Sequence, residues 1–321
     1  MKFEKIFEAF PTPKFLNFPY AGISISDTFV RCIQFAKNDK GLFVEKYSER
    51  PVPAGVVQSG QITNPNELGL ILETLKKDLG LGFVKVSLPE EKAYLFTAKI
   101  PIVAPKDVRG AIEFKMEENV PVSPAELIFD YMVTENYGDH LDVVVSALPV
   151  ALVDSYVDVL NSVGLSPLSL EIESQAVARA ILPKGSIGTV LLVHFGVEKV
   201  GLYVASNGIV RFTSTVQTHS ETGDYSDFLS KEIKKLFTYW KALKDNVDKE
   251  ERKIKEIIVC GENFSEEIVP FVSVHNKIPV TMGNVWVNAF DINTVIPEIP
   301  FKESLKYTSA VGLSLPSPVL I

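Results

Sequence analysis

The residues best suited to chemistry lie at the tip of a hairpin that the sequence predicts near the start of the chain. Tyr20 to Ile25 and Val30 to Phe35 are short apolar segments typical of strands, and Ser26-Asp27-Thr28 between them has the small polar residues of a turn. Successive backbone N–H groups at such a tip form a concavity that can bind an anion. The stretch therefore predicts either a phosphate-binding loop or an ordinary hairpin.

Other residue patterns that could support catalysis or metal binding are not apparent. The four histidines show no spacing typical of metal ligands, and His194, in an apolar strand, has the setting of a buried core residue. The chain has no P-loop, no nucleophile elbow and no arrangement of paired carboxylates. We therefore expect no catalytic residue and no metal site.

Composition and charge narrow the class of function. A chain of 321 residues is too long for one compact core and predicts two domains or several subdomains. Its net charge of -8 argues against a nucleic-acid partner, because affinity for phosphates depends largely on Lys and Arg. Cys32 and Cys260 both lie in apolar segments, so we expect buried free thiols in a reducing compartment rather than a disulfide.

The sequence also predicts a cytoplasmic protein. The longest nearly apolar run, residues 143–153, is interrupted by Ser146 and Pro149 and is too short to span a membrane. Charged residues at the N-terminus do not fit a signal peptide. Phenylalanine and isoleucine recur there at helical spacing, so residues 1–19 are expected to form an amphipathic segment and a Pro-rich linker, which packs on its own domain or on a partner.

The elements that position the hairpin belong to a first domain, predicted over residues 20–89. A third strand at Gly41 to Ser48 extends the hairpin into a sheet. A helix follows that begins at Asn64-Pro65 and ends at Gly80, and a further strand comes after it. Because a helix separates the last strand from the others, we expect that strand to return by a right-handed crossover.

Two further units complete the predicted organisation. Residues 90–165 are expected to form an inserted small α/β subdomain, with the order strand, helix, two strands, helix. Residues 166–315 are expected to form a second domain, which begins with a strand and an Ala-rich helix that has Ser174 as its N-cap. Three strands between Thr189 and Thr215 then repeat the opening pattern of the chain. The tail, residues 316–321, carries no signal.

Three longer stretches resemble the PilM family of type IV pilus assembly proteins, which are actin-like and related to the cell-division protein FtsA. Phe114 to Tyr131 is similar to the family's helix, proline turn and following strand, and Ile172 to Ala180 is similar to its interdomain helix. Pro53 to Ile62 matches its Pro-Gly-Val loop. The resemblance covers Ala21 to Leu315 and implies an α/β fold of the actin-like, ribonuclease H-like type, duplicated in two domains with an inserted small α/β subdomain.

The family's nucleotide motifs are recognisable, but each has lost a key residue. Where the family reads Gly-Leu-Asp-Ile-Gly-Ser followed by Lys, Ser24 stands for the Asp, Ser26 for the Gly and Arg31 for the Lys. In the second phosphate hairpin, His194 replaces an Asp while Gly196 is retained.

The third motif is the adenosine turn, where the family's double glycine reads Gly261-Glu262. A lost carboxylate removes about 4 kcal/mol of attraction to a cation roughly 4 Å away, and an added side chain blocks close approach of the backbone to a ligand. The resemblance therefore implies a degenerate nucleotide site with no cofactor expected, ATP with Mg²⁺ being the alternative. Its positions are Ser24, Ser26, Arg31, Gly196, Gly261 and Glu262.

The resemblance implies a cytoplasmic scaffold of a type IV pilus or a related secretion machine. In the family, the N-terminal cytoplasmic peptide of a PilN-like inner-membrane protein binds a groove beside the inserted subdomain. We therefore expect the same kind of partner, peripheral association with the inner membrane and no ATP turnover, and self-association stays open. Two alternatives remain: an ATP-binding switch or slow ATPase that uses a rearranged site, and a module similar to the type II secretion protein GspL.

Overall fold

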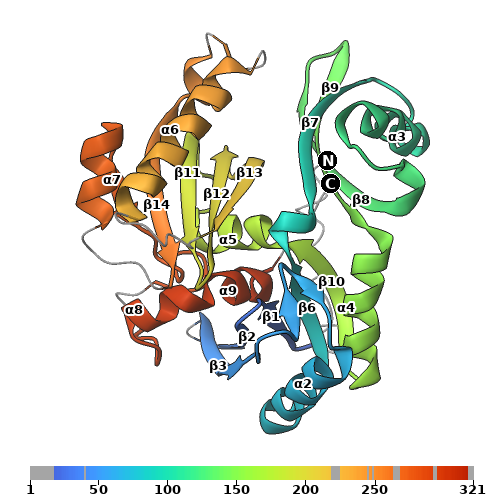
Figure 1. The fold of residues 1–321 in the computed structure, drawn as a ribbon, viewed down its shortest axis with the longest axis vertical. Helices are drawn as coiled ribbons and strands as arrows, with labels where there is room; N and C mark the ends of the chain where they lie inside the picture. Colours follow the sequence, from blue (N-terminus) through green and yellow to red (C-terminus); the bar gives the residue numbers. More distant parts are fainter. Residues whose placement is uncertain are drawn as a thin grey trace.

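The structure is a computed structural model that describes residues 18–39, 41–217, 225–243, 246–247, 249–262, 268–291 and 295–316. Most of the predicted amphipathic segment and of the tail lie outside these residues. In the described part, two lobes lie against a central pair of helices, and a smaller unit stands beside the second lobe (Figure 1).

Each lobe is built on a five-stranded sheet, and the two sheets share one topology. In both, three antiparallel strands follow one another along the chain, and two later strands run parallel to the first. The predicted internal duplication is therefore present. Lobe I has the order β10-β6-β1-β2-β3, with β1 (Tyr20–Ile25), β2 (Phe29–Asn38), β3 (Gly41–Pro51), β6 (Phe83–Leu88) and β10 (Ser166–Ile172). Lobe II has the order β13-β12-β11-β14-β15, with β11 (Thr189–Phe195), β12 (Lys199–Ser206), β13 (Ile209–Gln217), β14 (Ile254–Gly261) and β15 (Val280–Met282).

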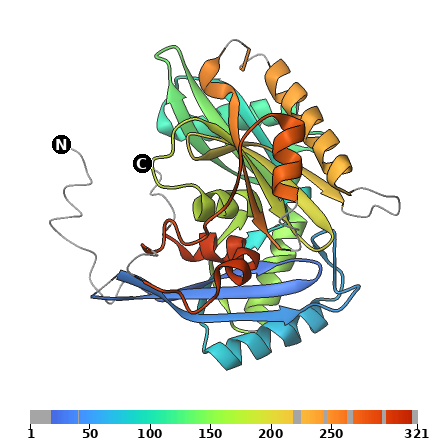
Figure 2. The same ribbon diagram turned by 90° about the vertical axis from the view of Figure 1, so that its left-hand side faces the viewer.

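Helices cover both faces of each sheet. α2 (Pro65–Leu79) and α4 (Val150–Ser162) pack on the outer face of the lobe I sheet. α6 (Tyr225–Ala242) and α7 (Ile268–Asn276) pack on the outer face of the lobe II sheet. α5 (Glu173–Ile181) and α9 (Thr308–Ser314) cross between the lobes and bury their small and apolar residues against both sheets, as Figures 1 and 2 show. The short helix α8 (Phe301–Ser304) leads into α9.

Local sequence signals account for the ends of α2. The amide of Glu67 donates a 3.2 Å hydrogen bond to the Asn64 side chain, and Pro65 occupies the first turn, where its missing N–H costs nothing. Gly80 ends the helix with a φ of 62°, a left-handed conformation that glycine adopts without a steric penalty. The prediction for this helix is confirmed at both ends. Just before it, β4 (Val57–Gln58) and β5 (Gln61–Ile62) form a small hairpin.

The smaller unit is a three-stranded sheet, β7 (Tyr94–Pro101), β9 (His140–Pro149) and β8 (Leu127–Asn136), with α3 (Val108–Asn119) packed on one face. Strand β8 of this unit contacts lobe II. Arg211 of β13 donates a 3.1 Å hydrogen bond to the Thr134 hydroxyl, and the Arg252 guanidinium lies 3.1 Å from a Glu135 carboxylate oxygen. The unit therefore lies beside the edge of the second sheet.

Two boundaries in the sequence prediction differ from the observed packing. The sequence assigns β10 to the second domain, predicted over residues 166–315, but β10 pairs with β6 and belongs to the lobe I sheet. It assigns α4 to the inserted subdomain, but Leu152 and Tyr156 bury this helix against lobe I. Neither pairing partners nor packing partners can be deduced from the periodicity of one segment, because periodicity defines a buried face and not what covers it.

The predicted N-cap of α5 is also wrong. Ile172 occupies the cap position and makes no side-chain cap hydrogen bond. The amide of Ser174, in the first turn, instead donates a 2.9 Å hydrogen bond to the carboxylate of Glu90. A carboxylate at a helix N-terminus interacts favourably with the helix dipole and with unpaired amides, so this distant acid takes the place of a local cap.

Candidate functional site

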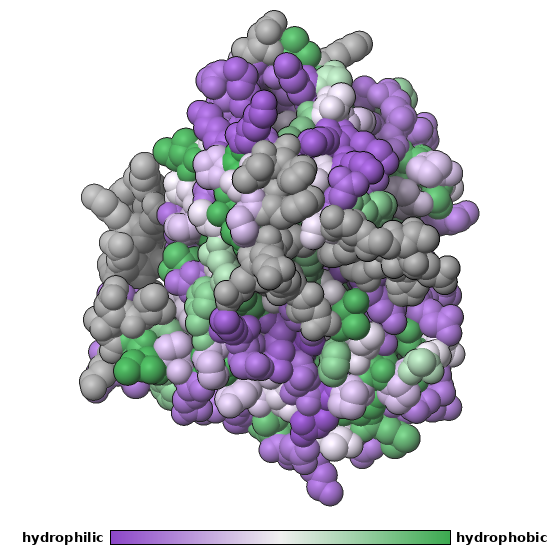
Figure 3. Space-filling view, turned by 60° about the vertical axis from the view of Figure 1, so that its left-hand side comes forward, coloured by the Kyte–Doolittle hydropathy of each residue, from purple (hydrophilic) through white to green (hydrophobic). Residues whose placement is uncertain are grey.

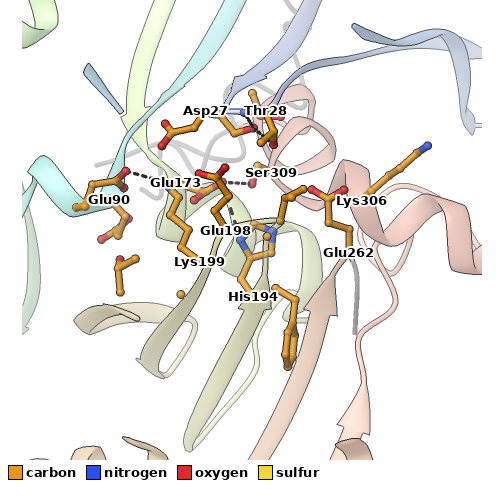
Figure 4. A pocket seen from close by; sticks show the side chains of 18 of the residues that line it. Asp27, Thr28, Glu90, Glu173, His194, Glu198, Lys199, Glu262, Lys306 and Ser309 are labelled. Atoms are coloured by element: carbon orange, nitrogen blue, oxygen red, sulfur yellow. Dashed lines mark hydrogen bonds and ion pairs between the residues drawn. The ribbon is translucent and has the colours of Figure 1, made fainter. Parts of the chain in front are cut away.

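A pocket lies in the cleft between the two lobes, at the carboxyl ends of β1 and β11 (Figure 4). The hairpin tip after β1, the turn after β11, the residue after β14, and the N-terminal parts of α5 and α9 all contribute to its walls. Its cavity volume is about 90 Å³, well below the roughly 300–1,000 Å³ typical of small-molecule pockets.

Most of the predicted site residues meet in this pocket. Ser24, at the end of β1, lies opposite Arg31 of β2 in the antiparallel pair, and both line the pocket together with Ser26. From lobe II, Gly196 and Glu262 line the opposite wall. Three motifs far apart in the sequence are therefore brought to one cleft.

Gly261 is the one of the six predicted positions that does not line the pocket, and its role is local. Its φ is +96°, and a Cβ atom there would lie 2.1 Å from the carbonyl oxygen of Phe195. This close approach allows the amide of Glu262 to donate a 2.8 Å hydrogen bond to the same oxygen. Gly261 therefore fixes the direction in which the Glu262 side chain enters the cleft.

Two of the predicted motif positions, Arg31 and Glu262, bind each other across the cleft. Both terminal nitrogens of the Arg31 guanidinium donate to the Glu262 carboxylate, at 2.7 and 2.6 Å, and its Nε donates to Glu49 at 2.6 Å. Lys306, just before α9, lies 3.2 Å from Glu49. The Arg31 side chain is only 8% exposed and that of Glu262 15%. Two parallel N–H···O bonds give such a pair both strength and a defined orientation, so the pair links lobe I to lobe II.

The pKa values of this cluster favour its charged state. Burial opposes the charge of Arg31, but hydrogen bonds and charges from Glu262 and Glu49 raise its pKa above the usual value. Burial likewise acts against the charge of Glu49, yet Arg31 and Lys306 hold its pKa below the usual value. The four groups therefore balance one another within the protein.

The hairpin tip has internal hydrogen bonds where a phosphate-binding loop would present free amides. The Ser26 hydroxyl accepts a 3.0 Å hydrogen bond from the amide of Phe29, and the Ser26 amide donates to the Phe29 carbonyl at 2.9 Å. The Asp27 carboxylate accepts hydrogen bonds from the amides of Ser59 and Gly60, at 2.8 and 3.0 Å. Of the two predictions for this turn, a phosphate-binding loop and an ordinary hairpin, the ordinary hairpin fits the geometry better.

The other side of the pocket is acidic. Glu90 and Glu91 follow β6, and Glu173 begins α5. Lys199 of β12 lies 2.5 Å from a carboxylate oxygen of Glu91. The Ser309 hydroxyl donates a 3.0 Å hydrogen bond to Glu173. Figure 4 shows Glu90, Glu173 and Lys199 on one side of the site and Glu262 with Lys306 on the other.

His194 also lines the pocket. Its Nδ1 is 3.9 Å from a carboxylate oxygen of Glu173. Burial is the main effect that lowers its pKa, although Glu173 and Glu262 act in the opposite direction. A neutral imidazole is therefore favoured at neutral pH. Within the described residues, no group of three or more His, Cys, Asp or Glu side chains has the arrangement of a metal site.

Sequence reasoning missed the acidic residues Glu90, Glu91 and Glu173 and the lysine Lys199. One signal for the acids was available, because Glu90-Glu91 and Glu173 each follow directly after a strand of the lobe I sheet. The carboxyl ends of parallel strands meet at one edge of a sheet, which is where α/β folds place their sites. Recognising this required knowing that β10 is parallel to β6.

The profile of the family described as type IV pilus assembly protein PilM matches residues 22–219, more than half of the chain. This chain belongs to the PilM family. A solved structure of a PilM-PilN type IV pilus biogenesis complex matches this PilM-family chain with a TM-score of 0.76 and 16% identity, over 92% of this chain and 97% of that chain. The predicted actin-like α/β fold and the resemblance to PilM are both confirmed.

More distant similarities to this PilM-family chain also exist. The cytoplasmic domain of EpsL, an inner membrane component of the type II secretion system of Vibrio cholerae, matches with a TM-score of 0.48 and 11% identity, over 81% of this chain and 95% of that chain. The ethanolamine utilization protein EutJ from Carboxydothermus hydrogenoformans also matches with a TM-score of 0.48, at 12% identity, over 95% of this chain and 90% of that chain. No curated protein sequence matches the chain.

None of the helices in the described residues is both long enough and apolar enough to cross a bilayer. On the face in Figure 3, hydrophilic residues predominate and hydrophobic residues form small separate areas. The described residues on this face would therefore make both polar and apolar contacts.

Proposed function

We propose that this PilM-family protein acts in type IV pilus assembly as a scaffold that does not need nucleotide to hold its two lobes together. One observation carries the proposal: Arg31 and Glu262 stand at two of the family's nucleotide-motif positions and bind each other at 2.6 to 2.7 Å. A nucleotide in such a cleft would bridge the lobes, and here the ion pair makes that bridge. The scaffold lies in the cytoplasm, at the inner face of the inner membrane.

The charge of the pocket supports the same proposal. Three cationic side chains line it, Arg31, Lys199 and Lys306. Six carboxylates line it as well, Asp27, Glu90, Glu91, Glu173, Glu198 and Glu262. A triphosphate would therefore meet a net negative wall, and like charges about 4 Å apart repel by roughly 4 kcal/mol at an effective dielectric near 20.

Thermal unfolding with and without Mg-ATP tests the nucleotide part of the proposal. We expect no saturable rise in the melting temperature up to millimolar Mg-ATP. A ligand present at 100 times its dissociation constant would stabilise the protein by about 2.7 kcal/mol, which thermal unfolding would detect. A saturable rise would favour the alternative, an ATP-binding switch or slow ATPase, and would overturn nucleotide independence.

The partner of the scaffold is, in our proposal, the cytoplasmic N-terminal peptide of a PilN-like inner-membrane protein. The groove beside the inserted unit is the expected contact, and the ties of Arg211 and Arg252 to β8 support it by holding that unit in a fixed place beside lobe II. Calorimetry with the peptide should give saturable binding, and a peptide of scrambled sequence should give none. Equal heats from the two peptides would contradict the assignment of this partner.

A further inference from the structure

The acidic half of the cleft has an excess of negative charge that the protein itself does not neutralise. The term "acidic half" here means the side of the pocket lined by Asp27, Glu90, Glu91 and Glu173, with Lys199 as the cationic side chain among them. Figure 4 labels all of these except Glu91. On the opposite side, Arg31 and Lys306 are matched by Glu49 and Glu262. The imbalance is therefore confined to one half of the pocket.

One carboxylate oxygen of Glu90 is buried without a close hydrogen-bond partner. Glu90 is only 4% exposed, yet it lines the pocket. Oε2 accepts the hydrogen bond from the Ser174 amide, whereas Oε1 is buried without a hydrogen-bond partner among the described residues. Oε2 of the neighbouring Glu91 is likewise buried without a hydrogen-bond partner among the described residues. An unpaired buried oxygen destabilises the protein, the more so when the group is charged, so a hydrogen-bond donor in the pocket would be stabilising.

The wall already holds one alkylammonium group, that of Lys199. Burial acts against its charge, but Glu91 and Glu173, together with Asp27, raise its pKa above the usual value. The surroundings therefore stabilise a primary ammonium group. After this pairing, the unpaired oxygens of Glu90 and Glu91 remain.

The arrangement selects against a metal ion. Ca²⁺ takes about six to eight oxygen ligands around one point, and no converging group of three or more His, Cys, Asp or Glu side chains exists among the described residues. An ammonium group has three N–H donors that can point to separate acceptors, and a cavity of about 90 Å³ has room for a short alkyl chain rather than a large ligand. We propose that the acidic half of the cleft binds an alkylammonium group, supplied by a small diamine or by the lysine side chain of a peptide.

Binding should be linked to loss of a proton from Glu90. Burial raises the pKa of Glu90 to about 7, although the Ser174 amide acts in the opposite direction. The titratable groups near it are Glu91 in the same turn, Glu173 of α5 and Tyr203 of β12. A bound cation favours the ionised carboxylate, so affinity should rise between pH 6 and pH 8.

Isothermal titration calorimetry on the full chain tests the proposal. The probes are 1,4-diaminobutane and an end-blocked tripeptide with a central lysine, each at constant ionic strength and pH 8, with 1,4-butanediol as the uncharged match. We expect saturable binding of at least one amine and none of the diol. The tighter of the two amines identifies the source of the ammonium group.

Two substitutions locate the binding. Glu90→Gln keeps an acceptor for the Ser174 amide but removes the charge, and it should weaken amine binding by about tenfold or more. Glu73→Gln, on the exposed face of α2, changes the net charge equally and should leave affinity unchanged. Should Glu90→Gln fail to fold, Glu91→Gln serves as the second variant, with the same expected loss.

Three outcomes would overturn the proposal. The first is the absence of saturable heat with both amines, and the second is equal affinity in the wild type and the folded variant. The third is saturable Mg²⁺ binding that Glu90→Gln abolishes, since this would make the acidic half a metal site.

Discussion

At the scale of single residues, Arg31 and Glu262 form a mutually dependent pair. The Glu262 carboxylate would be a largely buried, unpaired negative charge if Arg31 did not face it, and Arg31 has Glu49 as a second partner. Breaking one partner of a largely buried pair leaves an uncompensated charge, which costs more than the pair contributes. Each of the two residues therefore depends on the other.

A double-mutant cycle on Arg31→Met and Glu262→Gln should reveal this dependence. Glu262→Gln should lower the free energy of unfolding by about 3 kcal/mol, and the coupling energy of the pair should be about 1–3 kcal/mol in urea unfolding. The matched control is the exposed pair Arg50–Asp78, 2.7 Å apart, for which coupling should stay below about 1 kcal/mol. Equal coupling in the two pairs would contradict a structural role for the cleft pair.

The buried Glu90 should make stability depend on pH. Its pKa is about 7 in the folded protein against an ordinary value of 4.5, so the folded state binds its proton more tightly than the unfolded state does. The favourable contribution is complete below pH 4.5 and is lost as the pH rises through 7. Relative to wild type, Glu90→Gln should gain up to about 3 kcal/mol of unfolding free energy between pH 5 and pH 8. Urea unfolding of both proteins at these two pH values is the measurement, and a difference that does not change with pH would refute the shift.

At the scale of elements, the crossing of α5 and α9 determines how closely the lobes approach. The small residues of α9 allow contact at backbone distance, since a Cβ atom on Gly312 would lie 1.8 Å from the carbonyl oxygen of Ala176. Ser314 of the same helix donates a 2.6 Å hydrogen bond to the Ile33 carbonyl of β2 and accepts one from the Gly22 amide of β1. α9 is thus tied to lobe I while it packs on α5.

Replacing Gly312 by alanine should therefore separate the two helices. We expect a loss of about 2–3 kcal/mol of unfolding free energy, typical of overpacking at a close contact. Gly110→Ala, in α3, is the matched control, because no atom lies within 4 Å of the position of its Cβ. That change should stabilise the helix by up to about 1 kcal/mol. Thermal and urea unfolding distinguish the two, and equal effects would show that the crossing does not depend on Gly312.

At the scale of the whole molecule, the cleft combines contributions from both lobes, so its ligand preference is a property of the assembled fold. Ser24 and Ser26 come from lobe I, while His194 and Glu262 come from lobe II. Because they converge on one site, their effects on a ligand should not be additive. A single substitution is therefore a weak test of what the cleft can bind.

A fourfold variant tests this convergence. It combines Ser24→Asp, Ser26→Gly, His194→Asp and Glu262→Gly, the residues that the resemblance implies for the family's motifs at these positions. The variant should bind fluorescent ATP with Mg²⁺ more tightly than wild type, since it regains metal-orienting carboxylates and room for the ligand, whereas each single change should do little. Equilibrium binding by fluorescence anisotropy is the measurement. Tight binding by the wild type would contradict our interpretation of the cleft, and failure of the variant would place the defect at other residues.

Sequence patterns were sufficient for much of the local structure, and the resemblance to the family gave the positions of the altered motifs. The ends of α2 followed from Asn64, Pro65 and Gly80, because capping and left-handed glycine are local properties of the chain. The repeated hairpins gave the duplication, since apolar alternation and turn residues define strands without reference to their partners. The resemblance to the family marked Ser24 and Glu262 as departures, and both line the cleft.

Only the tertiary structure decided what these residues do. Arg31 and Glu262 are 231 positions apart, and Glu90 caps a helix that begins 83 residues later, with its hydrogen bond to Ser174 spanning 84 positions. No periodicity or spacing relates such residues, because they meet only after β10 joins the first sheet and α5 and α9 cross between the lobes. Whether a buried charge is tolerated depends on the partner that folding brings to it, and that partner is a property of the whole fold.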